Sequence, residues 1–310
     1  MPVTTYMIKL SVAQNVKGYW YKKPGAWIAG IAAILTLDTG IYFLMRTPVR
    51  PGRCRAVLFS AGGTLRKIDD YKNGVLYIIH NDHLAPKDKF ITIYTPRGAD
   101  FSVRFPDSTT VWLNAKSTIR YPANFSQYSI ELTVKGEAYI EVARNRSPRL
   151  RISVGSVQIK PFGAHMDIKS YPDDPAAITM VAGGAKIWLD QKYPGLDETE
   201  LALHPSEQAK LSGLSFGEPV KLIVAPSVDD INDIISWKNG YTSFHNASIQ
   251  TIMHAVSRWY DVDIIYQGDI PDKKYNISLP RNAPIEQLLG VLRKQGGNFS
   301  VKGKTVNVMK

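Results

Sequence analysis

Short alternating runs of apolar and polar residues dominate the chain from about residue 56 to residue 215. β-branched and aromatic residues at every second position are typical of β-strands, and no stretch here repeats its apolar residues every three or four positions. Turn-forming residues separate the runs. We therefore expect an all-β domain over residues 56–215, folded as a roll, sandwich or solenoid. Its strands are predicted at residues 75–79, 90–94, 110–113, 128–132, 139–142, 151–154, 157–159 and 186–189.

A different pattern begins near residue 237. Apolar residues three and four positions apart predict one helix that Asn246 caps, and a second that begins at Pro284 and ends at Gly296-Gly297. Strand-like segments surround both helices, so residues 237–310 are expected to form a small α+β domain of order β-α-β-β-α-β-β, with both helices on one face of a sheet. Residues 216–236 are expected to be a linker, and Trp237-Lys238-Asn239-Gly240 to be the turn into the C-terminal domain. The apolar helix positions are Ile249, Ile252, Met253, Val256, Trp259 and Tyr260, then Ile285, Leu288, Leu289 and Leu292.

Residues 26–45 are almost wholly apolar and lie between Lys22-Lys23 and Arg46. Twenty residues of helix span roughly 30 Å, the thickness of a bilayer's hydrocarbon core. The span contains Asp38, which costs about 2.5 to 3.5 kcal/mol in a membrane. The first half alone would suit a signal peptide, but no small-residue cleavage site follows it. We expect a single transmembrane helix over 26–45 after a short tail of residues 1–25; basic residues are balanced on the two sides and do not orient it.

The composition narrows the possible partners. The 310 residues carry 38 Lys+Arg against 27 Asp+Glu, a net charge of +11, and one cysteine, Cys54, which excludes an internal disulfide. A basic excess is compatible with nucleic acid, with an anionic membrane surface, or with solubility alone. Because the basic residues are scattered and form no recognisable nucleic-acid motif, we do not expect nucleic acid as a partner.

Catalytic chemistry has no evident basis in the sequence. His80 and His83 are the only closely spaced histidines and lack a third ligand nearby, and Asp38-Thr39-Gly40 has no second copy to complete an aspartic-protease dyad. No phosphate-binding, dinucleotide or hydrolase motif occurs. We expect no enzyme, no cofactor and no metal, and hence a function in binding. Tryptophan and tyrosine are favoured at interfaces, although core packing is their commoner role; the candidate partner-binding residues are Trp237, Tyr241, Trp259 and Tyr260.

Several segments together resemble one family. Thr95-Pro96-Arg97-Gly98, followed by Val111-Trp112-Leu113-Asn114-Ala115, is similar to the TPRG and VWLNA stretches of FecR-type proteins of Bacteroidetes. Tyr171-Pro172-Asp173-Asp174, Trp237-Lys238-Asn239-Gly240 and Arg258-Trp259-Tyr260-Asp261-Val262 follow in the family's order. The resemblance covers about residues 90 to 310.

The resemblance implies a function. FecR-type proteins are anti-sigma regulators that hold an extracytoplasmic-function sigma factor with a cytoplasmic N-terminal domain. One helix crosses the inner membrane, and the periplasmic part senses the signalling domain of a TonB-dependent outer-membrane receptor. By this resemblance the chain is a single-pass inner-membrane protein whose N-terminus is cytoplasmic and whose bulk is periplasmic. Its C-terminal domain also resembles the secretin and TonB short N-terminal domain that the receptor carries, so the two could pair at their sheet edges.

One departure from the family leaves an alternative. Family members usually carry a small helical sigma-binding domain before the membrane helix, whereas this chain has about 25 residues there, with Ile8, Leu10 and Val12 in alternation. So short a segment is not expected to fold as that domain. The alternative function is a membrane-anchored periplasmic binding or scaffold protein that lacks a working sigma-binding domain.

Overall fold

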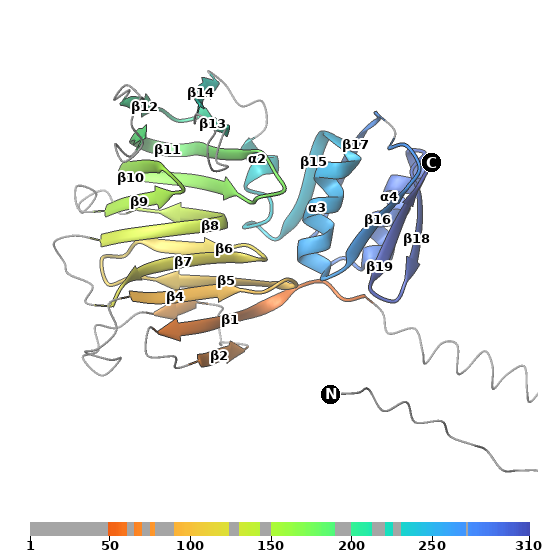
Figure 1. Cartoon of the computed structure of the whole chain (residues 1–310), viewed down its shortest axis with the longest axis horizontal. Helices are drawn as coiled ribbons and strands as arrows, with labels where there is room; N and C mark the ends of the chain where they lie inside the picture. Colours follow the sequence, from red (N-terminus) through yellow and green to blue (C-terminus); the bar gives the residue numbers. More distant parts are fainter. Residues whose placement is uncertain are drawn as a thin grey trace, which may run out of the picture. The chain divides into compact units, whose positions relative to one another are not determined.

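The computed structural model describes residues 49–60, 65–69, 75–77, 90–123, 130–142, 150–189, 200–212, 221–225, 231–270 and 272–310. Residues 49–310 form one compact unit, in which a large sheet precedes a smaller domain with two helices (Figure 1). The expected tail 1–25 and membrane helix 26–45 lie outside the described residues. None of the helices in the described ranges has the length and hydrophobicity that a bilayer crossing needs.

The large sheet confirms the expectation of a mainly β protein. Its strands pair in a closed ring, because β8, β6, β5, β1, β4 and β7 follow one another and β7 pairs back with β8. The described strands are β1 (Arg53–Ser60), β2 (Leu65–Asp69), β3 (Val75–Tyr77), β4 (Phe90–Thr95), β5 (Ala99–Arg104), β6 (Thr110–Leu113), β7 (Ser117–Pro122), β8 (Ile130–Glu141), β9 (Leu150–Val154), β10 (Val157–Ser170), β11 (Ala176–Leu189), β12 (Leu201–Leu203), β13 (Gln208–Ser212) and β14 (Lys221–Ala225).

The sheet has two walls, because three long strands change neighbours along their length. The first part of β8 pairs with β7 and β9, and its last part pairs with β6 and β10. β10 and β11 change partners in the same way. Wall A consists of β4, β7, β9 and β12 with residues 57–60, 130–135, 157–162 and 184–189. Wall B consists of β5, β6 and β13 with residues 136–141, 165–170 and 176–182.

Glycines stand where the long strands pass from one wall to the other. Gly136 has a φ of +86°, and a Cβ there would lie 2.6 Å from the hydroxyl oxygen of Ser117. Gly183 has a φ of +73°, and its Cβ would lie 2.1 Å from the carbonyl oxygen of Gly163. A side chain at either position would strain the backbone and collide with the neighbouring strand. The bends between the walls therefore depend on glycine.

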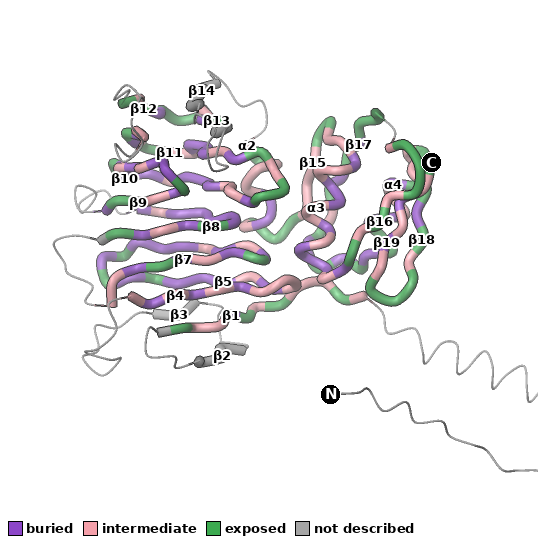
Figure 2. Tube along the Cα trace, viewed as in Figure 1, coloured by how far each residue is buried: buried purple, intermediate pink, exposed green. Residues whose placement is uncertain are grey.

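Buried residues recur along the strands of both walls (Figure 2), and their side chains form one hydrophobic core. β4, at a predicted strand, shows a regular alternation of buried and partly exposed positions, and so does β7, which was not among the predicted strands. The same alternation turns every second side chain outward, so each wall has an outer face. The largest fully buried side chains of this core include Ile93, Leu113, Ile119, Leu132, Ile140, Ile152, Ile159, Met166, Ile168 and Ile178.

The predicted strands are placed well but divided too often. The strand expected at 110–113 is β6. Those expected at 128–132 and 139–142 belong to the single strand β8, because Gly136 bends the chain without ending it. β14 pairs with β13 and so extends the sheet into residues 216–236, the range expected as a linker. A short helix, α2 (Ile231–Ile234), follows, and the chain then turns at residues 235–240.

The smaller domain has the predicted order of strands and helices. It comprises β15 (Tyr241–Ser248), α3 (Ile249–Tyr260), β16 (Asp263–Gln267), β17 (Lys274–Pro280), α4 (Ile285–Lys294), β18 (Asn298–Lys302) and β19 (Thr305–Met309). Two of its predicted details are wrong. The strands form two sheets, β15-β17 and β16-β19-β18, where one was expected. The N-cap of α3 is Ser248, whose hydroxyl accepts a hydrogen bond from the Thr251 amide, while Asn246 lies within β15 with a φ of +49°.

Candidate functional site

The last turn of α3 carries Arg258 into the boundary between the sheet and the smaller domain. There it meets the turn between β10 and β11. Nη2 of Arg258 donates to Asp174 Oδ2 at 2.6 Å, and Nη1 lies 3.3 Å from both carboxylate oxygens of Asp173. The guanidinium also stacks on Tyr171, 3.8 Å from the ring centroid. Because 6% of the Arg258 side chain and 2% of the Asp174 side chain are exposed, this is a buried ion pair.

The carboxylate of Asp174 contacts three side chains: Arg258, Lys169 and His254. Burial acts to raise the pKa of its carboxyl, but the charges of Lys169 and Arg258 and hydrogen bonds with His254 and Lys169 outweigh burial and lower the pKa to about 2. Lys169 Nζ lies 3.0 Å from Asp174 Oδ2, and His254 Nδ1 lies 2.8 Å from Oδ1. Asp174 therefore connects β10 of the sheet with two residues of α3.

The turn that carries Asp174 is itself fixed by Tyr171. Its hydroxyl donates to the Ala115 carbonyl at 2.6 Å and lies 3.2 Å from the hydroxyl of Ser117. Burial raises the pKa of Tyr171 far above its ordinary value, so the phenol stays protonated as a donor. The Asp173-Asp174 pair is thereby held at a fixed position relative to the loop between β6 and β7.

Arg281, just before α4, forms a second contact between the domains. Its guanidinium stacks 3.8 Å from the centroid of the Trp259 ring and donates to the side-chain oxygen of Asn114. Nε of Arg281 lies 3.9 Å from Asp100. The indole of Trp259 in turn donates to the Arg281 carbonyl at 2.8 Å. Arg281 therefore joins the two motifs that contain Asn114 and Trp259.

Arg97 forms a third contact at the end of α3. Its Nε donates to the Ser257 carbonyl at 3.3 Å, Nη1 to Asp263 at 2.8 Å, and Nη2 to the Val262 carbonyl. The Gly98 amide donates to the Arg258 carbonyl at 2.7 Å, and the Gly98 carbonyl accepts from the Arg53 amide at 3.0 Å. These bonds satisfy carbonyl groups that a helix end leaves free.

Trp237 and Lys238 attach the turn before β15 to the outer face of wall B. Nε1 of Trp237 donates to Asp167 at 3.2 Å. Nζ of Lys238 donates to Glu141 at 2.9 Å and lies about 4.5 Å above the rings of Trp112 and Tyr139. Burial, reinforced by the nearby charge of Glu137, raises the pKa of Asp167 well above its ordinary value. The smaller domain is thus held to wall B by a mixture of ionic, aromatic and hydrogen-bonding contacts.

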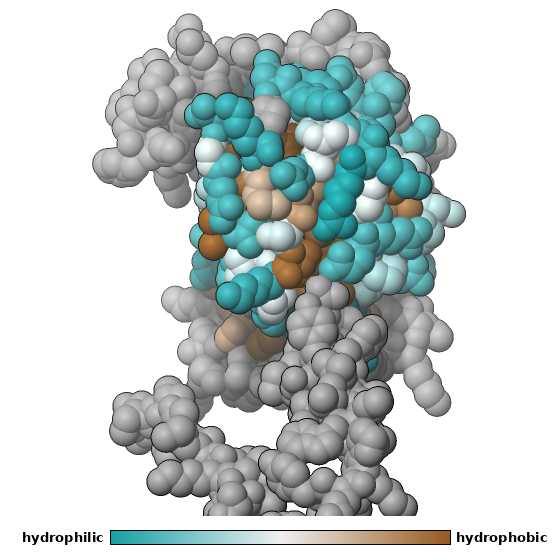
Figure 3. Space-filling model, turned by 90° about the vertical axis from the view of Figure 1, so that its right-hand side faces the viewer, coloured by the Kyte–Doolittle hydropathy of each residue, from teal (hydrophilic) through white to brown (hydrophobic). Residues whose placement is uncertain are grey.

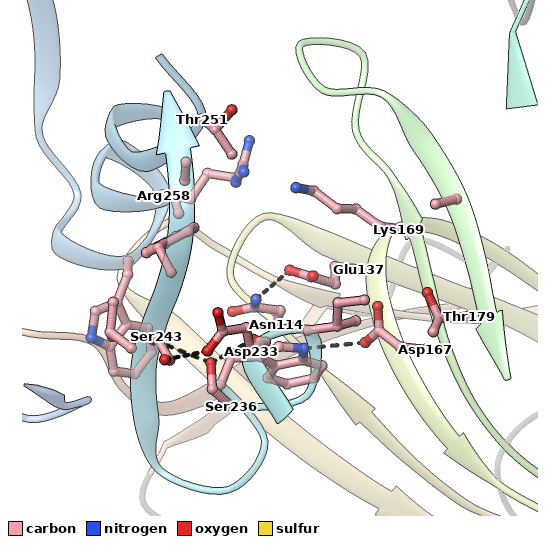
Figure 4. Close-up of a pocket in the computed structure, with 18 of the residues that line it drawn as sticks. Asn114, Glu137, Asp167, Lys169, Thr179, Asp233, Ser236, Ser243, Thr251 and Arg258 are labelled. Atoms are coloured by element: carbon pink, nitrogen blue, oxygen red, sulfur yellow. Dashed lines mark hydrogen bonds between the residues drawn. The ribbon is translucent and has the colours of Figure 1, made fainter. Parts of the chain in front are cut away.

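A cleft of about 820 Å³ opens beside these contacts. Figure 4 shows Asp167, Lys169 and Thr179 on its sheet side and Ser243, Thr251 and Arg258 on β15 and α3 opposite. Tyr241 also lines the cleft, and 52% of it is exposed. Within the described residues, no cluster of three metal-ligating side chains occurs here or elsewhere. The cleft offers a polar and aromatic surface for binding.

The sequence model of the FecR protein family matches residues 91–186, and the model of the FecR C-terminal domain matches residues 241–308. The chain belongs to the FecR family. The first matched region lies within the large sheet, and the second covers most of the smaller domain. No curated protein matches the chain.

Two solved structures share the FecR fold of this chain. Both are of a candidate anti-sigma factor from Parabacteroides distasonis, at 2.50 Å and 1.65 Å resolution. Each is 20% identical to this chain, with a TM-score of 0.59. They cover 71% of this chain, and the match extends over 99% and 98% of their own lengths.

The motifs that carry the FecR resemblance meet in space although they are scattered along the sequence. Arg97, Asn114, Asp174, Trp237 and Arg258 come from five separate motifs, and each contacts the other domain or the turn that leads to it. The sequence identified these segments as family motifs but assigned them no contact. A signal was present in their composition, because each motif combines aromatic or small residues with one or two charged or amide side chains.

The four predicted partner-binding residues are placed differently. Trp237, Trp259 and Tyr260 are buried and donate hydrogen bonds within the unit, to Asp167, Arg281 and Ala283. Tyr241 alone of the four is exposed. Partner binding by these residues stays a prediction; the structure leaves the ring of Tyr241 available for it and gives the other three a role in packing.

Proposed function

We propose that this FecR-family chain is a membrane-anchored regulator of the anti-sigma type. It would relay the state of a TonB-dependent outer-membrane receptor to an extracytoplasmic-function sigma factor by protein–protein binding. The observation that supports this most is the arrangement of the two FecR domains, which are held together by buried contacts that include the Arg258–Asp174 ion pair. Partner binding to one domain can reach the other through such contacts without any chemical step. In this proposal the chain is a single-pass protein of the bacterial inner membrane, with its bulk in the periplasm.

The edges of the two small sheets differ in how far they are open to a partner strand. Ser236 accepts hydrogen bonds from the amides of Tyr241 and Ser243 along β15. Gln295 bonds both the amide and the carbonyl of Asn276 in β17. The guanidinium of Arg293 donates to the Phe299 carbonyl in β18. Three of the four edge strands are therefore partly capped by groups of the same domain.

β16 is the edge strand that is left open. Its Asp263 amide donates to Lys304 on the β19 side, so the backbone groups of Ile264 and Tyr266 point to the other side. On this side, Val262 just before the strand accepts from Arg97 and donates to the Ser257 carbonyl, and among the described residues no partner bonds the backbone of Ile264 or Tyr266. Ile265 is 49% exposed on the same strand. The face of the smaller domain that lies at the right of Figure 1 is mostly hydrophilic, with a few apolar side chains toward its middle (Figure 3). An exposed isoleucine on an open edge favours β16 as the site where a receptor strand adds to the sheet.

The test is binding of the full chain, in lipid nanodiscs, to the signalling domain of the receptor encoded beside it. We expect the Ile265→Lys variant to bind at least 10-fold more weakly, because an edge charge opposes strand addition. The matched control is Ser300→Lys, an exposed position on β18 of the same sheet, which should bind as the parent does. No binding by the parent at tens of micromolar would overturn the proposal.

A second measurement distinguishes the regulator from the scaffold. Deletion of the gene should change transcription from the promoter of the neighbouring sigma factor if the chain is a regulator. Unchanged reporter transcription, with receptor binding retained, would instead support a periplasmic scaffold.

A further inference from the structure

The outer face of wall A carries a band of cations and aromatic rings. Every second side chain of its strands points outward, and within the described strands of this wall five of these are lysine or arginine and one, Glu131, is a carboxylate. The cations are Arg120, Lys135, Arg151, Lys160 and Lys186, and the outward aromatic residues are Phe59, Phe90, Tyr94, Phe162 and Trp188. No such concentration of one charge occurs on the outer face of wall B, where Glu137, Glu141 and Asp167 stand beside Lys169 and Lys210.

The cations and the rings of wall A lie next to each other. The guanidinium of Arg120 lies 3.8 Å from the centroid of Phe90, that of Arg151 lies 5.7 Å from Trp188, and the ammonium of Lys160 lies 5.9 Å from Phe162. Lys186 forms an ion pair with Glu200. Within the described residues, no carboxylate lies within ion-pair distance of the other four cations. Glu131 is the cross-strand neighbour of Arg151, and the excess of cations over this one carboxylate on the described part of the face favours an anionic partner.

The register of the strands places these side chains on one continuous surface. Thr92 is paired with Arg120, Thr118 with Lys135, and Lys160 with Lys186. Adjacent strands lie about 4.8 Å apart, so the face that extends from β4 to β11 is broad. A broad face of exposed cations and rings suits an extended anionic surface better than a single ligand. Amphipathic rings and basic side chains are also the groups that anchor proteins at lipid headgroups.

Among anionic surfaces, the one that the sequence itself implies is a lipid bilayer, because residues 26–45 are expected to cross one. The smaller domain contacts the outer face of wall B, and within the described residues it leaves the outer face of wall A uncovered.

We propose that the outer face of wall A docks on the anionic surface of the lipid bilayer. This rests on the membrane-anchored part of the proposed function and not on its receptor or sigma factor. Docking would turn the outer face of wall A toward the lipid headgroups.

The test compares the full chain in nanodiscs of pure phosphatidylcholine with nanodiscs that contain 30% phosphatidylglycerol. Hydrogen–deuterium exchange should slow several-fold in peptides from β7 to β10 when the anionic lipid is present. The triple variant Arg120→Ser, Arg151→Ser, Lys160→Ser should lose this protection. Because each cation near an anionic surface contributes about fivefold in binding, the variant should dock on the order of 100-fold more weakly. Raising the salt from 0.05 to 0.5 M should weaken docking of the parent.

The matched control makes the same charge change on the smaller domain, with Lys274→Ser, Lys294→Ser and Lys302→Ser, all exposed. It should keep the protection. Equal loss in both triple variants would overturn the proposal, because net charge alone would then explain the result. Absence of lipid-dependent protection would also overturn it, as would protection by a soluble polyanion such as dextran sulfate but not by the anionic nanodisc.

Receptor binding on the same nanodiscs separates the two proposals. If anionic lipid gives the parent chain no protection but the receptor still binds, the result counts against membrane docking by wall A and not against the proposed function. Loss of receptor binding with docking intact counts against the proposed function alone.

Discussion

The two walls of the sheet share one core but have opposite outer faces. Wall B presents carboxylates beside aromatic and amide groups, and these are covered by Trp237, Lys238 and the smaller domain. Wall A presents cations beside aromatic rings, and within the described residues most of those cations have no acidic partner. Both faces arise from the same strands, since β8, β10 and β11 contribute to both walls. The alternation of inward and outward residues that forms the core therefore also forms two outer faces. The smaller domain covers the outer face of wall B and not that of wall A.

If wall B is a structural face, breaking its ionic contact should have the largest effect. Arg258→Ala leaves the buried carboxylate of Asp174 without its closest cation, and removing one partner of a buried pair costs about 3 to 5 kcal/mol in the free energy of unfolding. Urea denaturation monitored by tryptophan fluorescence measures this. The control is Lys294→Ala, at an exposed position in the last turn of α4, which should cost less than about 0.5 kcal/mol. A cost below about 1 kcal/mol for Arg258→Ala would show that the pair does not hold the domains together.

The same pair predicts a pH dependence of intermediate size. The pKa of Asp174 is lowered to about 2 in the folded chain, from 3.8 as its ordinary value. Its contribution to stability is therefore fully present above about pH 4 and is lost as the pH falls toward 2. That contribution is about 2 kcal/mol. Asp174→Asn should flatten the stability curve between pH 2 and pH 5, measured by denaturation at each pH. Asp173→Asn, which removes the more exposed neighbour, should leave the slope close to that of the parent.

The smallest effect is expected on wall A. Within the part of the chain that the structure describes, Lys186 is the one outward cation of this wall in an ion pair, with Glu200. The triple variant Arg120→Ser, Arg151→Ser, Lys160→Ser should therefore change the free energy of unfolding by no more than about 0.5 kcal/mol per site. Urea denaturation of the detergent-solubilised chain measures this free energy. A loss of several kcal/mol would mean that wall A is also a structural face, and would remove the contrast between the walls.

Sequence patterns predicted the local structure of this chain better than its long-range contacts. The strand at residues 110–113 and the apolar faces of α3 and α4 follow from periodicity, because the residues involved are close in sequence and each faces the nearest core. The division of β8 into two strands was wrong, because a glycine with positive φ can bend a strand as well as end it. The two separate sheets of the smaller domain could not be foreseen, since pairing between β15 and β17 depends on how α3 packs.

The candidate site was the harder part to predict. Arg258 and Asp174 are 84 residues apart, and nothing in either motif specifies the other as its partner. Trp237, Trp259 and Tyr260 were selected for their residue type, which is common to interfaces and to cores. Whether such a side chain is buried distinguishes core packing from partner binding, and burial is known only once the chain is folded. The basic excess could be measured from the composition, but its concentration on one face requires the strand register.

The loop at Gly98 has a mechanical consequence. Two backbone hydrogen bonds run through this one residue, from the Arg53 amide to its carbonyl and from its amide to the Arg258 carbonyl. Gly52 lies against the Trp259 ring at the same place. Tension applied to the chain ahead of residue 49 would therefore load the end of α3 directly, before it loads the strands of the sheet. A pulling force would therefore pass from residue 49 through the backbone hydrogen bonds of Gly98 to α3, the helix that carries Arg258.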